Sequence, residues 1–123
     1  MKVIKTKLFA KWAIKNYVSD ESLDIAAKEI ALEIYEANYG GGVIKKRVAN
    51  KGRGKSGSTR TIVVFKKGKH CFFVFGFEKN AKSNISSNEE KAFKIIAKSL
   101  LAYSDIEIDK LIQEGALVEV ENE

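Results

Sequence analysis

Two strand-forming runs, at 59–66 and 69–78, constrain the fold more than any other part of the chain. They read TRTIVVFK and KHCFFVFGFE, so both are rich in β-branched and aromatic residues. Lys67-Gly68 lies between them, and a glycine in so short a polar connection is typical of a tight hairpin turn. The sequence therefore predicts an antiparallel hairpin with its turn at Lys67-Gly68.

The register of this hairpin decides which side chains share a face of the sheet, because directly opposite residues project to the same side. With the turn at Lys67-Gly68, Arg60 lies opposite Phe75, and Lys79 lies opposite Ser56. One predicted face carries Ser58, Arg60, Ile62, Val64, Cys71, Phe73, Phe75 and Phe77, with Lys79 as a candidate to continue it, and the other carries Thr61, Val63, Phe65, Phe72 and Val74. Arg60 and Lys79 are thereby predicted to lie close together at the same end of the sheet. Both faces are apolar in the middle, so we expect other elements to cover both.

The segment before the hairpin reads as a strand, two helices and another strand. A short strand is predicted at 2–6 and a longer one at 43–48. Apolar residues at helical spacing predict a first helix from Lys7 to about Val18 and a second from Asp20 to the Gly40-Gly41-Gly42 run. The expected buried stripe of the second helix is Leu23, Ala27, Ile30 and Ile34. We expect the two helices to form a hairpin on one face of the sheet.

Two capping boxes predict helices in the last third of the chain. The first, from Ser87 to Glu90, opens a helix whose apolar stripe is Phe93, Ile96, Ala97, Leu100 and Leu101. The second, from Ser104 to Glu107, opens a short helix that stops before Gly115, with a last strand at 116–120. The fold class is therefore α+β, in one domain: an antiparallel sheet of about four strands, the helical hairpin on one face, and a C-terminal helix.

Positive charge is concentrated in the middle of the chain. Between residues 40 and 82 there are twelve basic residues and one acid, a net +11 in a chain whose net charge is +6, so the remainder is net −5. Part of that remainder is the C-terminal segment 105–123, with seven acids and one lysine. It either folds back to shield the basic region or only keeps the chain soluble. A field this uneven attracts polyanions, above all nucleic acid.

Other classes of function fit the sequence poorly. One cysteine and one histidine cannot make the usual zinc sets. No apolar run is long enough to cross a membrane and no signal peptide is evident, so we expect a cytoplasmic protein without cofactor or small-molecule ligand. The loop ANKGRGKS resembles a phosphate-binding P-loop, but a strand follows it instead of the required helix. His70 is predicted at the opposite end of the hairpin from Arg60, which argues against its being catalytic.

The element order, together with a set of short motifs, resembles the RelE/ParE toxin superfamily of toxin–antitoxin modules, and most closely its RelE/HigB-like branch. The resemblance covers about residues 1–103, with 104–123 as an acidic extension of the same domain. The motifs are Gly40-Gly41-Gly42-Val43 with Lys45-Lys46-Arg47, Gly54-Lys55-Ser56-Gly57 leading into Arg60-Thr61, and Phe75-Gly76-Phe77 with Lys79-Asn80 and Asn84-Ile85.

The resemblance implies a metal-independent endoribonuclease that enters the ribosomal A site and cuts mRNA there. The ribose 2′-hydroxyl attacks the adjacent phosphorus and leaves a 2′,3′-cyclic phosphate. Arg60 matches the family's strand arginine, and its planar fork suits two phosphate oxygens. Lys79 matches a basic position after the last strand, where it holds the phosphate or moves a proton. Lys55 is the third candidate catalytic residue.

Further residues are assigned to RNA binding by the same resemblance. The basic ones are Lys45, Arg47, Lys51, Arg53 and Lys82. Phe77 is either a stacking platform for a base or a core residue. The implied partners are a cognate antitoxin, the ribosome and mRNA.

The sequence departs from the family after the last strand, where some relatives carry a tyrosine and residues 80–86 carry none. The general acid and base therefore stay open. Two alternative functions also stay open, a non-catalytic RNA-binding module and a ParE-like inhibitor of gyrase.

Overall fold

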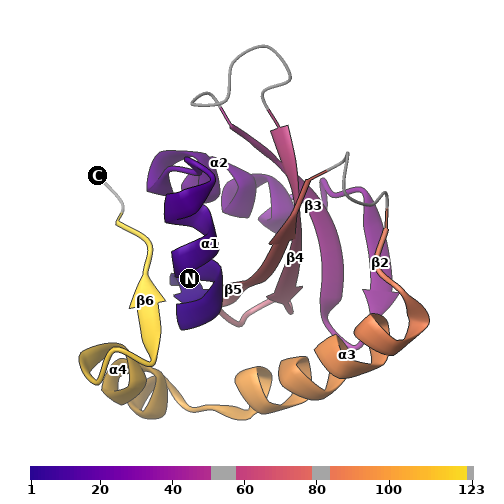
Figure 1. Cartoon of the computed structure of the whole chain (residues 1–123). Coiled ribbons are helices and arrows are strands. Elements are labelled where there is room, and N and C mark those ends of the chain that lie inside the picture. The colour runs from indigo at the N-terminus through magenta and orange to yellow at the C-terminus, as the bar shows by residue number, and fades with distance from the viewer. Residues whose placement is uncertain (51–57, 79–83, 122–123) are drawn as a thin grey trace.

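A six-stranded sheet in the order β2-β3-β4-β5-β1-β6 forms the centre of the fold (Figure 1). The structure is a computed structural model that describes residues 1–50, 58–78 and 84–121. The elements are β1 Val3–Thr6, α1 Lys7–Lys15, α2 Asp20–Ala31, β2 Ala37–Gly40, β3 Val43–Ala49, β4 Ser58–Phe65, β5 Cys71–Phe77, α3 Ser87–Ala102, α4 Asp105–Gln113 and β6 Leu117–Glu119. The predicted α+β class is confirmed, with six strands where about four were expected.

Helices cover both faces of the sheet, as the apolar pattern of the hairpin predicts. On one face, α1 contacts β5 and α2 contacts β3, and their buried side chains include Phe9, Leu23 and Ile30. On the other face, α3 and α4 contribute Phe93 and Ile108 to a second core. Within the described ranges, no helix has the length and apolar character needed to cross a bilayer.

The β4–β5 turn lies where the sequence places it, but the strands leave the turn out of the predicted register. The Lys69 N–H donates to the carbonyl oxygen of Lys66 at 2.9 Å, which closes the turn. Strand pairing then begins with Phe65 opposite Cys71. The β5 side therefore carries one extra residue, His70, before the ladder starts.

A second extra residue follows at Val74. Ile62 lies opposite Phe75 and Val63 lies opposite Phe73, so Val74 is passed over as in a β-bulge. The predicted pairing of Arg60 is therefore wrong: Arg60 lies opposite Phe77, not Phe75. The predicted pairing of Lys79 and Ser56 lies outside the described residues.

These two register shifts change which side chains share a face close to the turn, but they leave the predicted faces unchanged beyond Val74. A shift of one residue moves a strand's side chains to the other face, and a second shift moves them back. Close to the turn the prediction is wrong, because Val64 shares a core with Phe72 instead of with Cys71 and Phe73. Beyond the bulge, Phe75 and Phe77 lie on the face of Ile62, as predicted.

The second helix is shorter than predicted, because the last residues assigned to the helix form strand β2 instead. Helix α2 ends at Ala31, and Ile34 is 50% exposed and outside the stripe. Gly41 and Gly42 form the turn between β2 and β3, with φ of 64° and 86°. Two consecutive residues at positive φ suit glycine and are typical of a two-residue hairpin turn. The glycine run thus connects two strands.

Lys46 on β3 stabilises the C-terminal end of α2. Its side chain is buried on the α2 face of β3, where its Nζ lies 2.9 Å from the Glu29 carboxylate and donates to the Ile34 carbonyl oxygen at 3.0 Å. A positive charge is favourable at the C-terminal end of a helix. Lys46 is therefore part of the fold and does not face an RNA ligand.

Both predicted helices of the C-terminal third are present. The second capping box, Ser104 with Glu107, is confirmed. The first lies one residue earlier than predicted, with Ser86 as N-cap and Glu89 as its partner. Helix α4 leads into β6, which pairs antiparallel with β1 at the edge of the sheet far from β2.

Candidate nucleic-acid interface

Neighbouring strands bring two guanidinium groups together. Arg47 on β3 lies directly opposite Arg60 on β4. Lys45 lies opposite Ile62, two pairs closer to α3 and therefore on the same face. We call Lys45, Arg47 and Arg60 the basic cluster. All three come from regular strands, so the sheet holds their backbone positions.

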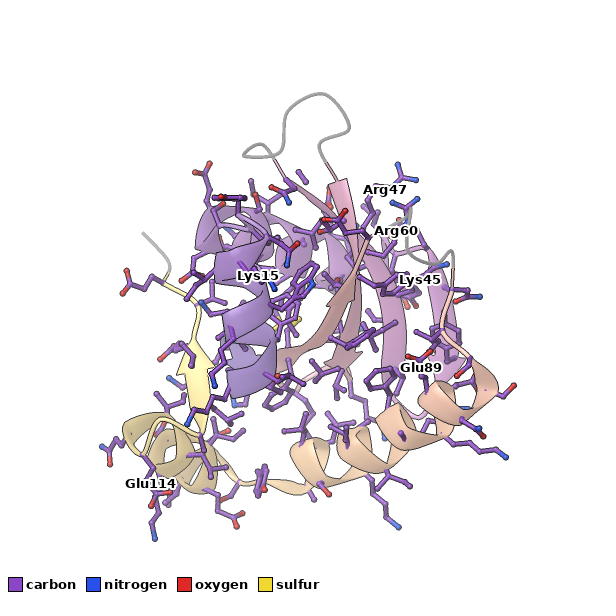
Figure 2. All side chains as sticks on the ribbon, in the orientation of Figure 1. Lys15, Lys45, Arg47, Arg60, Glu89 and Glu114 are labelled. Carbon is purple, nitrogen blue, oxygen red and sulfur yellow. The ribbon has the colours of Figure 1, made fainter. Side chains whose placement is uncertain are left out.

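The basic cluster lies where the cover of the sheet by α3 ends (Figure 2). Arg47 and Arg60 lie near each other at the end of the sheet away from α3, with Lys45 between them and Glu89. Arg47 is exposed, and Arg60 and Lys45 are half-buried. Among the described residues, no carboxylate forms an ion pair with any of these three side chains. The cluster thus presents positive charge that no ion pair among the described residues neutralises, and the nearest carboxylate contact is that of Glu36 with the Arg47 backbone N–H.

Arg47 and Arg60 break an ordinary rule of sheet design. Like charges directly opposite each other on an antiparallel pair destabilise it, where an opposite-charge pair would contribute about 0.2–1 kcal/mol. Departures of this kind tend to occur at functional sites, where a ligand supplies the missing charge. A phosphate has the charge and the oxygen geometry to bridge two guanidinium groups.

The other predicted site residues separate into two groups. Phe77 is 5% exposed, and its ring lies 6.0 Å from that of Phe75 between ring centroids, in the core beneath α3. The remaining predictions, Lys51, Arg53, Lys55, Lys79 and Lys82, lie outside the described residues. The expected proximity of Lys79 to Arg60 stays a prediction.

Tyr39 is a residue near this surface that sequence reasoning missed. It lies on β2, and its hydroxyl donates a short hydrogen bond to the side-chain oxygen of Asn84. Burial, and secondarily the charge of Glu90, raise the pKa of Tyr39, so its hydroxyl stays a proton donor at neutral pH. The signal for its position was the alternating sequence before the Gly41-Gly42 turn, which is typical of a hairpin strand.

Comparison with known families agrees with this arrangement. The family model described as the RelE toxin of the RelE/RelB toxin–antitoxin system matches residues 1–120. The chain belongs to the RelE toxin family. The match extends past residue 103 and includes α4 and β6 of the acidic C-terminal region. A RelE toxin has an antitoxin as its partner, so a cognate antitoxin is implied for this chain as well.

The acidic C-terminal region of this RelE-family chain does not cover the basic cluster, as far as its described residues extend. Glu114, after α4, lies at the opposite corner of the molecule from Arg47 and Arg60 (Figure 2). Instead, Asp109 and Glu119 lie 3.7 and 3.4 Å from the Lys2 ammonium. The acids of α4 and β6 thus compensate the basic N-terminus.

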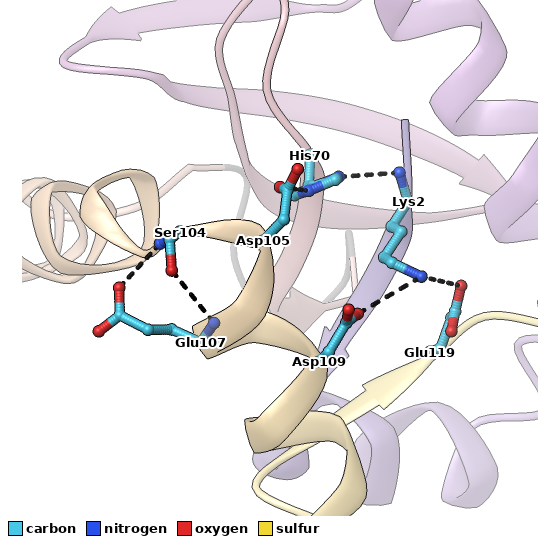
Figure 3. A network of polar contacts seen from close by, with 7 residues as sticks. All are labelled: Lys2, His70, Ser104, Asp105, Glu107, Asp109 and Glu119. Atoms are coloured by element: carbon cyan, nitrogen blue, oxygen red, sulfur yellow. Dashed lines mark hydrogen bonds and ion pairs between the residues drawn. The ribbon is translucent and has the colours of Figure 1, made fainter.

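His70 belongs to this second network (Figure 3). Its Nδ1 accepts from the Lys2 backbone N–H at 2.9 Å, and its Nε2 lies 2.8 Å from the Asp105 carboxylate. Because Nδ1 is an acceptor, the proton lies on Nε2 and is donated to Asp105. His70 is therefore at the opposite end of β4 and β5 from Arg60, as the sequence predicts, and it connects β1 to the first turn of α4.

This network predicts an acid-sensitive attachment of α4. The hydrogen bond from His70, and then attraction to its charged form, lower the pKa of Asp105 below its ordinary value of 3.8. A depressed pKa contributes stability that is complete above the ordinary value and is lost as the pH falls through the lower folded value. Asp105→Asn is therefore expected to lower Tm at about pH 7, and the difference from the parent should shrink as the pH falls below the ordinary value of 3.8.

Thermal melts across this pH range test the prediction. Glu114→Gln serves as the control, because it also removes one negative charge near the end of α4. A Tm difference for Asp105→Asn that does not shrink as the pH falls below 3.8 would show that the charge of Asp105 does not stabilise the attachment.

Proposed function

We propose that this RelE-family toxin is an endoribonuclease that cuts mRNA in the A site of the ribosome and thereby stops translation in the cytoplasm. The observation that carries the proposal is the direct opposition of Arg47 and Arg60 on β3 and β4. Two guanidinium groups that form no ion pair among the described residues suit a phosphodiester backbone better than a neutral ligand.

The proposed reaction needs positioning and charge stabilisation. The 2′-hydroxyl attacks the adjacent phosphorus, the 5′-oxygen of the next nucleotide leaves, and a 2′,3′-cyclic phosphate remains. One proton leaves the 2′-oxygen and one is added to the 5′-oxygen. Between these states the phosphate gains negative charge, and fixed donors aimed at that charge accelerate the reaction most.

Each cluster residue has a distinct role in this proposal. Arg60, half-buried and held by β4, donates to the non-bridging oxygens of the scissile phosphate, where its charge is least screened by water. Arg47 is more exposed and holds the same or the neighbouring phosphate. Lys45 contacts the RNA backbone on the side of α3. Lys79 and Lys55 are proposed to complete the site, with Lys79 holding the phosphate or moving a proton.

The test is to map RNA ends after inducible expression of the chain. We expect growth arrest together with new 5′-hydroxyl ends inside coding regions of cellular mRNA. Purified protein should produce the same cuts, with 2′,3′-cyclic phosphates, on mRNA bound to programmed ribosomes and not on the same mRNA free in solution.

Three other outcomes would each reject the proposal in a different way. Growth arrest with intact mRNA indicates a protein target such as gyrase. Salt-sensitive RNA binding without scission indicates a binding module. Cleavage of free mRNA at the same rate indicates a ribonuclease that does not depend on the ribosome.

A further inference from the structure

Glu36 is a carboxylate that strand pairing brings to the basic cluster. It directly precedes β2, and one of its side-chain oxygens, Oε1, accepts a short hydrogen bond from the Arg47 backbone N–H. Its own N–H donates to the Lys45 carbonyl oxygen at 2.9 Å. These two bonds to β3 hold the backbone of Glu36 and one oxygen of its carboxylate in place.

The same bonds indicate that Arg47 and Arg60 lie close together. Each residue of a strand directs its N–H and C=O groups to one neighbouring strand, and successive residues alternate between the two neighbours. The Arg47 N–H is directed at Glu36, on the β2 side, and therefore not at β4. The pair of Arg47 and Arg60 is thus non-hydrogen-bonded, the kind in which the Cα atoms are only about 4.5 Å apart and the side chains are closest.

Glu36, Arg47 and Arg60 form a row across the sheet, with the carboxylate at one end. Neighbouring strands are about 4.8 Å apart, so the row spans about 10 Å. Strand β2 is the outermost strand on this side, which leaves the carboxylate end of the row at the edge of the sheet (Figure 1). A phosphate bound by the two guanidinium groups can therefore have its adjoining ribose over Glu36.

Within this row, only Glu36 is able to accept a proton. Guanidinium and ammonium groups are donors without an acceptor, whereas an ionised carboxylate is an acceptor only. The other charged residues of β3 are Lys45, on the face of the cluster, and Lys46, which lies on the α2 face and is paired with Glu29. Neither ammonium group can replace Glu36 as an acceptor.

The carboxylate of Glu36 is both oriented and accessible. The hydrogen bond from Arg47 engages Oε1, and no group in the described part of the chain bonds to Oε2. Glu36 is exposed, so a ligand can reach this second oxygen. A base whose orientation is fixed by a bond to a third group is the usual arrangement for activating a hydroxyl.

We propose that Glu36 is the general base of the mRNA cleavage. Its Oε2 accepts the proton of the 2′-hydroxyl while the 2′-oxygen forms its bond to phosphorus and the bond from phosphorus to the 5′-oxygen breaks. The 5′-oxygen takes a proton from water, and Glu36 then returns its own proton to the solvent, so the reaction consumes no net proton. Arg47 and Arg60 stay charged and hold the phosphate. The inference rests on the proposed function, because it names the base of that same site.

Single-turnover cleavage of mRNA on programmed ribosomes tests the proposal. Glu36→Gln keeps a side-chain oxygen that can accept the Arg47 N–H, but the amide cannot take up a proton. We expect its maximal rate to fall by about 100-fold or more, which is the usual contribution of a positioned base. KM should stay within about twofold of the parent, because the arginines still hold the phosphate. The Tm should equal that of the parent.

Glu33→Gln is the matched control. Glu33 lies in the same connection between α2 and β2, is exposed, and loses the same charge on this substitution. We expect this variant to cleave at the rate of the parent.

Chemical rescue separates a base from a residue that only positions the site. In Glu36→Ala, added formate can occupy the space of the missing carboxylate and accept the proton in its place. We expect formate to raise the cleavage rate of Glu36→Ala by about tenfold or more, and to leave the rates of the parent and of Arg60→Gln unchanged.

The outcomes distinguish this proposal from the proposed function. If the parent cuts mRNA and Glu36→Gln cuts it equally fast, Glu36 is not the base, and the proposed function stands. A rate loss that Glu33→Gln shares, that accompanies a fall in Tm, or that formate does not reverse in Glu36→Ala gives Glu36 a structural role and also overturns the proposal. A parent that leaves mRNA intact rejects the proposed function itself, and the base together with it.

Discussion

Replacing Arg60 with glutamine is expected to slow mRNA cleavage by about 100-fold or more while the fold stays intact. Glutamine keeps a polar side chain on β4 but removes the guanidinium that we propose for the phosphate. Loss of one donor aimed at developing charge typically reduces the rate by about 10²–10³. The rate is measured in a single turnover on programmed ribosomes, so that the chemical step is separated from product release.

The same substitution makes an independent prediction about stability. Arg60 lies opposite Arg47, so removing one of the two charges relieves a repulsion. The Tm of Arg60→Gln should therefore equal or slightly exceed that of the parent. If Arg60 contributed only to packing, Arg60→Gln would lower the Tm together with the cleavage rate.

Two further substitutions separate the site from general charge effects. Lys67→Gln removes one positive charge at the β4–β5 turn, at the far end of the hairpin from Arg60, and should cleave as the parent does. Arg47→Gln should weaken RNA binding and reduce its salt dependence by about one phosphate contact. If Lys67→Gln and Arg60→Gln reduced the cleavage rate equally, the effect of Arg60 would be one of general charge and would not depend on its position.

The pairing of Arg47 with Arg60 illustrates what the sequence can and cannot predict. The strands and the turn were evident from composition and glycine position, because those signals are local. The register was not, because His70 and Val74 each add one residue to β5 for reasons outside the hairpin. His70 bonds to Lys2, and Val74 precedes the segment where α1 replaces β1.

Tertiary contacts also explain the missed strand β2. Ile34 continues the apolar stripe of the second helix, so helical periodicity extends α2 toward the glycines even though residues 35–39 alternate. In the folded chain, the Lys46 side chain donates a hydrogen bond to the carbonyl oxygen of Ile34, and the Gly41-Gly42 turn lets β2 pair with β3. The local sequence of a helix gives no sign that a lysine from a later strand will be buried against the end of that helix. For the same reason the buried, structural role of Lys46 could not be distinguished from the surface roles of Lys45 and Arg47 until the structure showed on which face of β3 each side chain lies.

Replacing Gly76 with alanine is expected to destabilise the chain by about 3 kcal/mol and to lower Tm by roughly 10 °C. A Cβ at this position would lie 2.3–2.5 Å from three carbons of the Trp12 ring, far closer than two carbon atoms can approach. Trp12 packs on Phe9, with ring centroids 5.5 Å apart, so a shift of the indole would disturb its contact with this core residue. Unfolding can be followed by fluorescence because Trp12 is the only tryptophan.

A second glycine separates this steric effect from backbone strain. Gly68 has a φ of +83° and nothing within 4 Å of an added Cβ, whereas the backbone of Gly76 is in a strand. Gly68→Ala should therefore cost only the strain of a left-handed residue, about 1 kcal/mol. The cost of Gly76→Ala should exceed it about threefold, although Gly76 is the glycine with the ordinary backbone.

Combining each alanine with Trp12→Ala completes the test, followed by circular dichroism because the fluorophore is gone. If the indole is the obstacle, Gly76→Ala becomes nearly neutral once Trp12 is removed, and the two substitutions show a coupling of about 2 kcal/mol or more. The cost of Gly68→Ala should be the same in both backgrounds, because the turn does not contact Trp12. A Gly76→Ala penalty that survives the loss of the indole would mean that Trp12 does not press on β5 at this position.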